Sequence, residues 1–193
     1  MPAVVDHDAR RQEIATAIGR LVAREGLQAV TVRAAAKEAG YSAAVIGHYF
    51  HGKDDLMNFT YLSARDRTQL RVERARLAGK SVFECLQECL PITDSRRNDW
   101  TVWFGLWGMA GGSSALQAER RRGLTEADSL FTQVLTSAQE RGEIRAGLDC
   151  AHAAQRLLMV VNGIATLWVQ MPEQWPPSAQ LDMLKAEIEP LLV

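Results

Sequence analysis

Four aromatic residues recur at helical spacing in the middle of the chain. Trp100, Trp103, Phe104 and Trp107 stand at positions i, i+3, i+4 and i+7, so a helix here would carry all four rings on one face. Aromatic faces attract cations, and cages of such rings recognise quaternary ammonium groups. The spacing therefore favours a site for a cationic or amphiphilic small molecule; the alternative is that the rings are ordinary core.

Residue sets for covalent, acid–base or metal chemistry are missing from the sequence. The four histidines are scattered, and no Ser-His-acid set, pair of acids or phosphate-binding loop can be assembled. Cys85 and Cys89 lie one helical turn apart, but no histidine accompanies them, which favours two buried small hydrophobic residues over a metal or redox pair. We therefore expect no enzymatic activity, no metal and no cofactor.

Composition indicates an ordinary globular protein. The chain has 193 residues, 47% of them hydrophobic, with 22 Lys and Arg against 23 Asp and Glu. Three cysteines and an acidic start without the order of a signal peptide predict a cytoplasmic protein. The uncharged stretches 100–118 and 157–172 are too short or too polar to span a membrane, so we expect no membrane association.

Apolar residues recur at intervals of three and four, which predicts an all-α protein of about nine helices. The first helix has a stripe that includes Ile14 and Ile18 and is expected to end at Gly26. Pro172, Pro176 and Pro177 force a break before the last helix. The other expected helices are 32–39, 42–50, 54–78, 82–90, 95–110, 116–141, 149–170 and 178–191.

Two short helices near the N-terminus carry strong local signals. Thr31 can cap the first, Gly40 can end it, and Ser42 can cap the second only two residues later. Two short helices joined by a tight turn that contains glycine form a helix-turn-helix. Ile46 and Phe50 are expected in its core, while Arg10 and Arg11 fit either a solvated helix start or an arm in a minor groove.

The segment from Thr31 to Leu56 resembles the DNA-binding head of the TetR family of transcriptional regulators. The matching positions are Thr31, Ala36, Ala39, Gly40, Ser42, Ile46, Tyr49, Phe50, Lys53 and Leu56. The resemblance implies that residues 1–53 are a DNA-binding head. The residues expected to contact DNA are small or can form hydrogen bonds, as suits a major groove. They are Thr31, Arg33, Ser42, Ala43, Ala44, Val45, His48, Tyr49 and Lys53.

Two positions of the head depart from the family pattern. Ala44 replaces a usual Gly and Gly47 a usual Tyr, so the resemblance implies one phosphate contact fewer. Through Thr60 the head also has seven basic and seven acidic residues, so DNA binding must depend on a local patch and should weaken with salt.

The body, residues 54–193, is similar to the subgroup of the choline-responsive repressor of glycine betaine synthesis. The similarity rests on the aromatic run from Trp100 to Ala110 and on two further segments, 142–145 and 161–164. It implies a ligand-binding and dimerisation domain and a small effector, with an amine or quaternary ammonium compound suspected. The residues expected to line the pocket are Tyr61, Trp100, Trp103, Phe104, Trp107, Asn162 and Trp168, with Asp94 and Asp99 as candidate carboxylates.

The last two expected helices carry apolar stripes that need a partner. In the TetR family such helices form a four-helix dimer interface, which implies a homodimer that reads two half-sites about one helical turn apart. The residues expected in the interface are Leu157, Val161, Ile164, Leu181, Leu184 and Ile188. Packing within a single chain is the alternative.

Taken with the resemblance, the sequence predicts a ligand-responsive transcriptional regulator. We expect a repressor that binds a palindromic operator as a dimer and is released by a small, cationic molecule. Two alternatives remain at this stage: a helical ligand-binding module that has lost specific DNA recognition, suggested by the neutral head and Gly47, and a transcriptional activator of the same fold.

Overall fold

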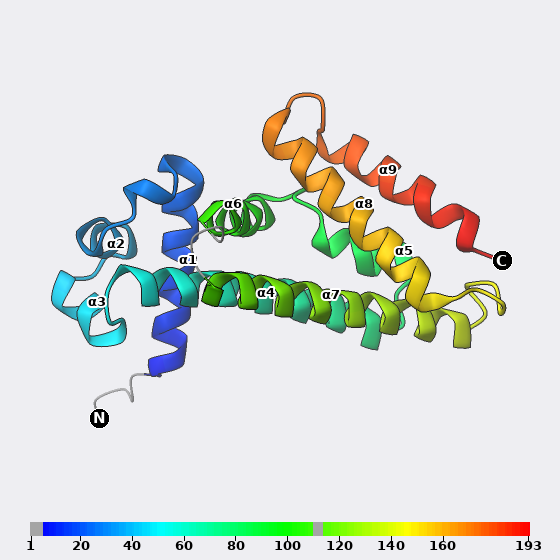
Figure 1. Cartoon of the computed structure of the whole chain (residues 1–193), viewed down its shortest axis with the longest axis horizontal. Coiled ribbons are helices and arrows are strands. Elements are labelled where there is room, and N and C mark those ends of the chain that lie inside the picture. Colours follow the sequence, from blue (N-terminus) through cyan, green and yellow to red (C-terminus); the bar gives the residue numbers. More distant parts are fainter. Residues whose placement is uncertain (1–5, 110–113) are drawn as a thin grey trace. The chain divides into compact units, whose positions relative to one another are not determined.

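The computed structural model describes residues 6–109 and 114–193, and nine α-helices lie within these ranges (Figure 1). The only extended pairing in this part of the chain is an isolated bridge between Ile144 and Leu192. The all-α class is therefore confirmed. The α-helices are α1 (His7–Glu25), α2 (Val32–Ala39), α3 (Ala43–Tyr49), α4 (Lys53–Leu77), α5 (Val82–Leu86), α6 (Asp94–Met109), α7 (Ser114–Glu140), α8 (Cys150–Gln170) and α9 (Pro177–Ile188).

Three short 3₁₀ turns complete the secondary structure of the described residues: η1 (Leu27–Ala29), η2 (Gln87–Cys89) and η4 (Glu189–Leu191). None of the described helices has both the length and the apolar character needed to cross a bilayer. Of the uncharged stretch 100–118, residues 110–113 lie outside the described residues, as does the expected end of a helix at Ala110.

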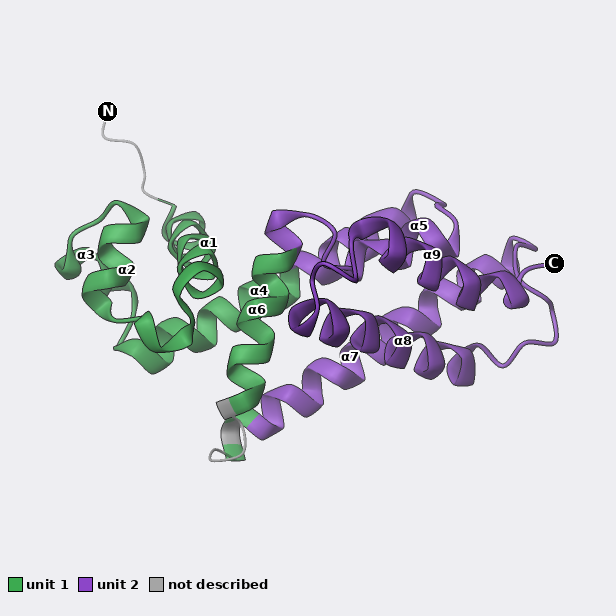
Figure 2. Cartoon of the chain, turned by 90° about the horizontal axis from the view of Figure 1, so that it is seen from above, with its two compact units in different colours: residues 1–66, 97–116 green, residues 67–96, 117–193 purple. Residues whose placement is uncertain are grey.

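The chain forms two compact units, coloured separately in Figure 2. Unit 1 contains residues 1–66 and 97–116, and unit 2 contains residues 67–96 and 117–193. The first unit therefore includes more than residues 1–53: it also holds the first part of α4 and most of α6. The division of function at residue 53 stays a prediction.

Local capping fixes the helices of the head where the sequence places them. The Thr31 hydroxyl accepts a hydrogen bond from the Ala34 amide at 3.1 Å, and Gly40 ends α2 in the left-handed conformation with φ of 74°. The Ser42 hydroxyl accepts from the Val45 amide at 3.2 Å and so begins α3. A residue with a side chain at position 40 would be strained, which explains the glycine in this turn.

The core of unit 1 joins α1, α2, α3, the start of α4 and α6. Ile46 and Phe50 are buried in it, as expected. From α6 it takes Val102 and Leu106, which are 0% and 5% exposed. The helix that carries the aromatic stripe is thus part of the same core as the helix-turn-helix.

In unit 2 the expected helix over residues 82–90 is shorter and changes type. Ser81 and Glu84 form a capping box at the start of α5, but the α-helix ends at Leu86 and continues as the 3₁₀ turn η2. Pro91 disfavours helical geometry at Leu90, so the last turn before it tightens.

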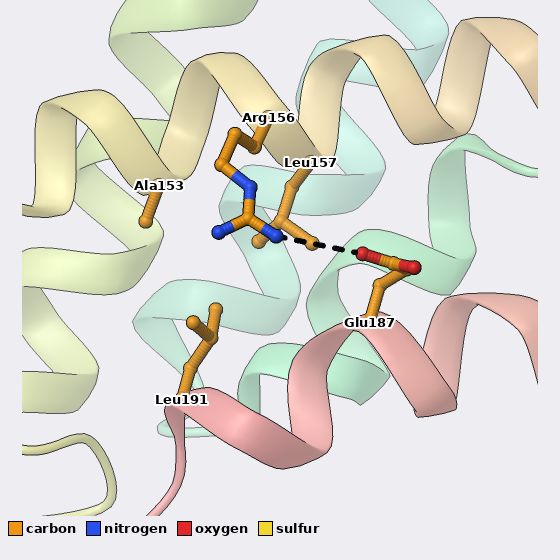
Figure 3. Close-up of a pocket in the computed structure, with 5 residues that line it drawn as sticks. All are labelled: Ala153, Arg156, Leu157, Glu187 and Leu191. Carbon is orange, nitrogen blue, oxygen red and sulfur yellow. Dashed lines mark ion pairs between the residues drawn. The ribbon is translucent and has the colours of Figure 1, made fainter.

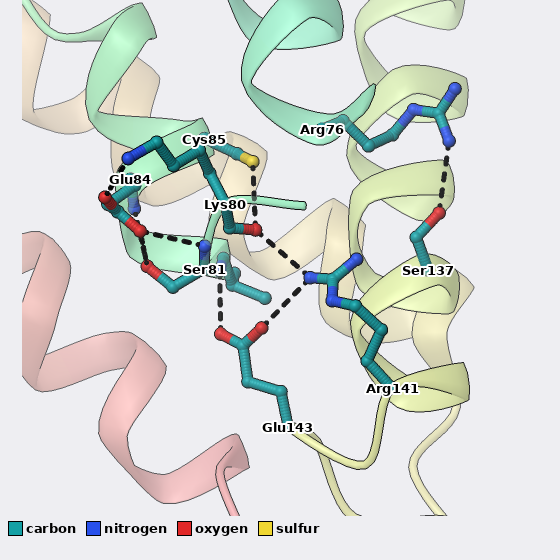
Figure 4. Close-up of polar contacts among 9 residues, drawn as sticks. Arg76, Lys80, Ser81, Glu84, Cys85, Ser137, Arg141 and Glu143 are labelled. Atoms are coloured by element: carbon teal, nitrogen blue, oxygen red, sulfur yellow. Dashed lines mark hydrogen bonds and ion pairs between the residues drawn. The ribbon is translucent and has the colours of Figure 1, made fainter. Parts of the chain in front are cut away.

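A polar network ties the C-terminal end of α4, the start of α5 and the end of α7 together (Figure 4). The Glu143 carboxylate accepts from the Val82 amide at 2.8 Å and from the Arg141 guanidinium at 3.1 Å. Arg141 also donates to the Lys80 carbonyl oxygen at 3.1 Å, and Arg76 donates to the Ser137 hydroxyl at 3.1 Å. The bond from Glu143 satisfies an amide of the first turn of α5 that has no partner within the helix, and the other bonds join the three segments.

Candidate functional site

The helix α3 presents small residues on its exposed face. Ala43, Ala44 and Gly47 are exposed, whereas Ile46 is 1% exposed and anchors the helix in the core. Such a face lets the backbone of a helix approach a flat or grooved surface closely. This arrangement suits a recognition helix in a major groove, where small side chains contact base edges.

The other predicted contact residues flank this face from neighbouring elements. His48 is exposed and Tyr49 half-buried at the end of α3, and Lys53 is half-buried at the start of α4. Thr31 and Arg33 are exposed at the start of α2, although the Thr31 hydroxyl already caps that helix. All nine predicted contact residues lie in unit 1, which is compatible with one continuous surface.

Residues outside the predicted set of contact residues also lie beside the recognition helix. The His7 ring centroid is 6.0 Å from that of His48 and 5.5 Å from that of Tyr49. Arg10 donates a hydrogen bond to the Tyr41 hydroxyl, which itself donates to the Glu13 carboxylate at 2.8 Å. No periodicity links α1 to these positions, so the sequence offered no signal for them.

Arg11 is not the solvated side chain or free arm that its position suggested. Its guanidinium carbon lies 4.1 Å from the ring centroid of Phe59 and 5.1 Å from that of Phe50. The cation–π contacts hold the Arg11 side chain, which is half-buried, against the core of unit 1. Arg11 is therefore neither at a solvated helix start nor in an arm that could reach a minor groove.

The aromatic stripe of α6 forms one continuous cluster of rings. The Trp100 ring lies 4.7 Å from Trp103, 5.4 Å from Phe104 and 6.2 Å from Trp107, measured between centroids. Trp100 is 3% exposed, whereas the other three are half-buried. Trp100 is thus the core member of the stripe, and the other three rings retain exposed surface.

One polar atom in this cluster lacks a partner. The buried indole N–H of Trp103 has no hydrogen-bond acceptor among the described residues. A buried donor without an acceptor is costly and uncommon in proteins. The cluster therefore offers both aromatic faces and one free hydrogen-bond donor.

The opposite face of α6 packs against the head. A Cβ atom added at Gly105 would lie 3.6 Å from the side chain of Leu27 in η1, and one added at Gly19 in α1 would lie 4.0 Å from Val102. Glycine at these positions lets the helices approach closely. The aromatic helix is thus in direct contact with the elements that support the helix-turn-helix.

The remaining predicted pocket residues divide between the two units. Tyr61 is 6% exposed and belongs to the core of unit 1, while Asn162 and Trp168 lie on α8 in unit 2. The Asn162 amide donates to the Leu158 carbonyl oxygen of its own helix at 2.8 Å. Of the two candidate carboxylates, Asp94 is exposed at the start of α6 and Asp99 is only 2% exposed.

Most of the residues expected in a dimer interface are buried within the single chain. Leu157, Val161, Ile164, Leu184 and Ile188 are at most 3% exposed, and Leu181 is half-buried. Because α8 and α9 pack against each other and the rest of unit 2, these five side chains have almost no surface left for a partner. The alternative of packing within one chain is therefore the one observed for them.

The surface where α8 and α9 meet is charged at one point. Arg156 and Glu187 form an ion pair at 3.9 Å over a shallow hollow lined by Ala153, Leu157 and Leu191 (Figure 3). The exposed apolar side chains of the two helices are Met159, Val169 and Met183, which are 66%, 41% and 41% exposed. The outer surface of the pair thus has different apolar residues from those that the sequence pattern selected.

Cys85 and Cys89 are free, buried side chains of unit 2. Cys85 and Cys89 are buried, and burial raises the pKa of their thiols to about 11 and about 12 respectively. No cluster of three or more His, Cys, Asp or Glu side chains in the described part of the chain is arranged to hold a metal ion. The interpretation of both cysteines as buried small hydrophobic residues is confirmed.

The chain is similar to known proteins, among them two curated relatives and one solved structure. PksA, an HTH-type transcriptional regulator of Bacillus subtilis (strain 168), is 26% identical over 174 residues, which cover 86% of this chain and 81% of PksA. BetI 2, an HTH-type transcriptional regulator of Chromohalobacter salexigens, is 42% identical over 60 residues, 31% of this chain and 29% of its own.

The similar structure is a putative transcriptional regulator from Saccharomonospora viridis in complex with choline. It has a TM-score of 0.73 and 23% identity, and the match covers 94% of this chain and 96% of that one. At this identity the match shows the shared fold.

Family models match both parts of the chain. Residues 14–58 match the bacterial regulatory proteins of the tetR family, and residues 80–193 match the C-terminal domain of BetI-type transcriptional repressors. The two matches cover the helix-turn-helix and nearly all of unit 2. The chain therefore belongs to the tetR family, with a BetI-type C-terminal domain, and is a DNA-binding transcriptional regulator and not an enzyme.

Proposed function

We propose that the protein is a repressor that binds a palindromic operator as a homodimer and is released by a small cationic molecule. The single observation that carries the ligand response is the position of α6. Its half-buried rings keep exposed surface that offers a site for a cation, and Trp103, Trp107 and the buried Val102 and Leu106 of the same helix pack in the core that supports the recognition helix. Because the operator is DNA inside the cell, we expect the protein in the cytoplasm.

DNA recognition rests on α3. The exposed small residues Ala43 and Ala44 contact base edges, and Tyr49 and Lys53 hold phosphates on either side. Because phosphate contacts release counterions, affinity falls steeply as salt rises. The family membership and the exposed surface of α3 both support this proposal.

Dimerisation uses the outer surfaces of α8 and α9. Met159 and Gly163 are exposed one helical turn apart on α8, and Met183 is exposed on α9. A flexible Met and a glycine at this spacing allow close packing of a second copy. Two recognition helices related by a two-fold axis then read two half-sites about one helical turn apart.

The effector is an amine or a quaternary ammonium compound. Choline, which the Saccharomonospora viridis neighbour binds, combines a quaternary ammonium group with an oxygen. The half-buried rings Trp103, Phe104 and Trp107 suit the cation, and the free indole N–H of Trp103 suits the oxygen. An effector that binds the released state better than the operator-bound state shifts the population toward release.

Two helices can pass the change to the recognition helix. The α6 helix contacts Leu27 through Gly105, and the α4 helix belongs partly to each unit and begins directly after α3. A small shift of either helix changes the position of α3 because their side chains share one core.

The first experiment tests the DNA function. Purified protein is used to select binding sites from random duplex DNA, and the affinity for the selected site is measured at two salt concentrations. We expect an inverted repeat with steep salt dependence. Enrichment of no sequence would favour the alternative of a ligand-binding module that has lost recognition, and reporter assays at the natural operator separate repression from activation.

The assignment of phosphate contacts is tested by the double variant Tyr49→Ala/Lys53→Ala. Loss of a charged and a hydroxyl contact should weaken operator binding by about 10- to 100-fold, at about 1–3 kcal/mol in total. The matched control is Lys80→Ala, which changes an exposed lysine of unit 2 that lies outside α8 and α9. Unchanged binding by the double variant would show that these residues do not hold DNA.

The effector class is tested by calorimetry with choline, a polyamine and an uncharged aromatic compound. We expect choline to bind and Trp103→Ala to weaken it by about tenfold, which corresponds to about 1.4 kcal/mol. Trp103→Phe keeps a ring but lacks the N–H, so it separates the cation contact from the hydrogen bond. Cationic ligands that are indifferent to both changes would exclude the aromatic site.

A further inference from the structure

A histidine from the first helix lies against the end of the recognition helix. The rings of His7, His48 and Tyr49 form a cluster with centroid separations of 6.0 Å, 5.5 Å and 5.1 Å. His7 and His48 are both exposed. Two ionisable rings from distant parts of the sequence therefore meet beside the small-residue face of α3.

The position of His7 is fixed by contacts on both sides. The Asp6 carboxylate accepts hydrogen bonds from the amides of Asp8 and Ala9 at 3.1 Å and so begins α1 directly before His7. One turn later, Arg10 and Glu13 both contact the Tyr41 hydroxyl in the turn before α3. The start of α1 is therefore attached to the helix-turn-helix rather than extended into solvent.

We propose that His7 belongs to the DNA-contacting surface and that His7 and His48 together make operator binding depend on pH. The inference rests on the proposed DNA-binding function and adds a residue and a form of regulation to it. Histidine is the side chain that gains a proton between about pH 8 and pH 5. Each proton taken up beside α3 adds one positive charge to a head that otherwise has seven basic and seven acidic residues through Thr60.

The surroundings of the pair contain charges of both signs. The ionisable groups on the adjoining segments are Asp6, Asp8, Arg10 and Arg11 of α1, Tyr41 of the turn, Tyr49 of α3, and His51, Lys53, Asp54 and Asp55 at the start of α4. Several of them are already engaged: Asp6 caps α1, Arg10 is bound to Tyr41, and Asp55 accepts from the His51 amide at 2.9 Å. The surface thus carries three imidazoles, and those of His7 and His48 are the two whose rings lie close to each other and to Tyr49.

Proton uptake is coupled to DNA binding by simple electrostatics. DNA phosphates beside the rings favour the charged form, so the complex holds more protons than the free protein. By linkage, operator affinity is highest at low pH and falls as pH rises.

The test is a titration of affinity for the selected operator at constant ionic strength. We expect the affinity to fall about fivefold to tenfold between about pH 6 and pH 8, which corresponds to an average uptake of slightly less than about half a proton over this range. The double variant His7→Gln/His48→Gln should change by less than about twofold over the same range. His7→Arg, with a permanent charge, should bind more tightly than the wild type at about pH 8.

Two further variants separate charge from packing. His7→Phe keeps a ring against Tyr49 but cannot be protonated, so it should fold normally and lose part of the pH dependence. His152→Gln changes an exposed histidine of α8 in unit 2 without adding an apolar ring to the proposed dimer surface, and it should leave the full pH dependence intact.

The outcomes distinguish this inference from the proposed function. Specific operator binding that is independent of pH, or whose pH dependence survives in His7→Gln/His48→Gln, would overturn the inference and leave the function standing. Absence of specific binding at every pH would overturn both. A fall in affinity with pH that the double variant removes and His152→Gln retains would establish it.

Discussion

The recognition helix α3 and the aromatic helix α6 lie in the same compact unit but use their surfaces in opposite ways. The α3 helix has one fully buried side chain, Ile46, and exposes Ala43, Ala44 and His48. The α6 helix buries Val102 and Leu106 on one side and Trp100 on the other. The first is held by caps at its ends and the second by packing along its length.

In α3, the residues expected to bind DNA differ from the residue that stabilises the fold. In α6, the same rings can serve both ligand binding and stability. Exposed side chains of α3 can change without a loss of core contacts, so their effect on DNA binding can be measured in a folded protein. A ring of α6 is both a packing residue and a candidate ligand contact. Substitutions in the two helices and in the segments that support them test this contrast.

Trp100→Ala should cause the largest loss of stability. The change removes a ring that is 3% exposed and contacts three other rings, so the free energy of unfolding should fall by about 3–5 kcal/mol. Denaturant unfolding followed by circular dichroism measures it. Trp175→Ala, at a half-buried tryptophan of unit 2, is the control and should cost less. An unchanged unfolding midpoint for Trp100→Ala would remove the contrast between α3 and α6.

Gly105→Leu should disturb the contact between α6 and the head. The new side chain would extend from a Cβ that lies 3.6 Å from Leu27, so overpacking should cost about 1–3 kcal/mol and weaken operator binding. Gly108→Leu is the matched control, because nothing lies within 4 Å of the corresponding Cβ on the same helix. If the two variants unfold and bind DNA alike, the contact at Gly105 has no role in supporting the head.

Ser42 offers a way to separate stability from binding in α3. Ser42→Ala removes the cap of Val45 and should lower the free energy of unfolding by about 1 kcal/mol. Ser42→Asp retains a capping oxygen but places a negative charge at the DNA face, so it should unfold like the wild type and bind DNA more weakly. Strong operator binding by Ser42→Asp would show that the start of α3 does not approach the phosphates.

The smallest expected effect concerns an ion pair between α1 and α2. Arg24 donates to Glu38 at 2.7 Å, and this hydrogen bond holds the pKa of the Glu38 carboxyl below its ordinary value of 4.5. A lowered pKa in the folded state means that the stabilisation is present above that ordinary value and is lost as pH falls through the lowered one. The stability difference between the wild type and Glu38→Gln should therefore shrink on acidification from about pH 6 to pH 3. A difference that is constant over this range would show that the pair does not stabilise the head.

Local signals explain why the head was predicted almost residue by residue. The bounds of α2 at Val32 and Ala39 agree with the expected ones, because Thr31 caps the helix and Gly40 ends it within the same short segment. The prediction of one continuous helix over residues 82–90 was wrong, because α5 ends at Leu86 and a 3₁₀ turn follows it. The end of this helix depends on how the chain accommodates Pro91. Caps are properties of a few adjacent residues, whereas the length of a final turn depends on its surroundings.

The apolar stripes of α8 and α9 show the limit of periodicity. An apolar stripe indicates that one face of a helix is buried, but it does not indicate whether the surface that covers this face belongs to the same chain or to another. Leu157, Val161 and Leu184 are covered within the chain, which leaves Met159 and Met183 for a partner. Neither methionine stands out in the sequence pattern.

The sequence by itself determined the all-α class, the position of the helix-turn-helix and the single face of the four aromatic rings, because each follows from spacing and caps along one segment. The tertiary structure decided which side chains remain available: it placed Trp100 in the core, used the stripes of α8 and α9 for internal packing and brought His7 to the recognition helix. Contacts between distant segments depend on how helices pack, and no local pattern encodes them.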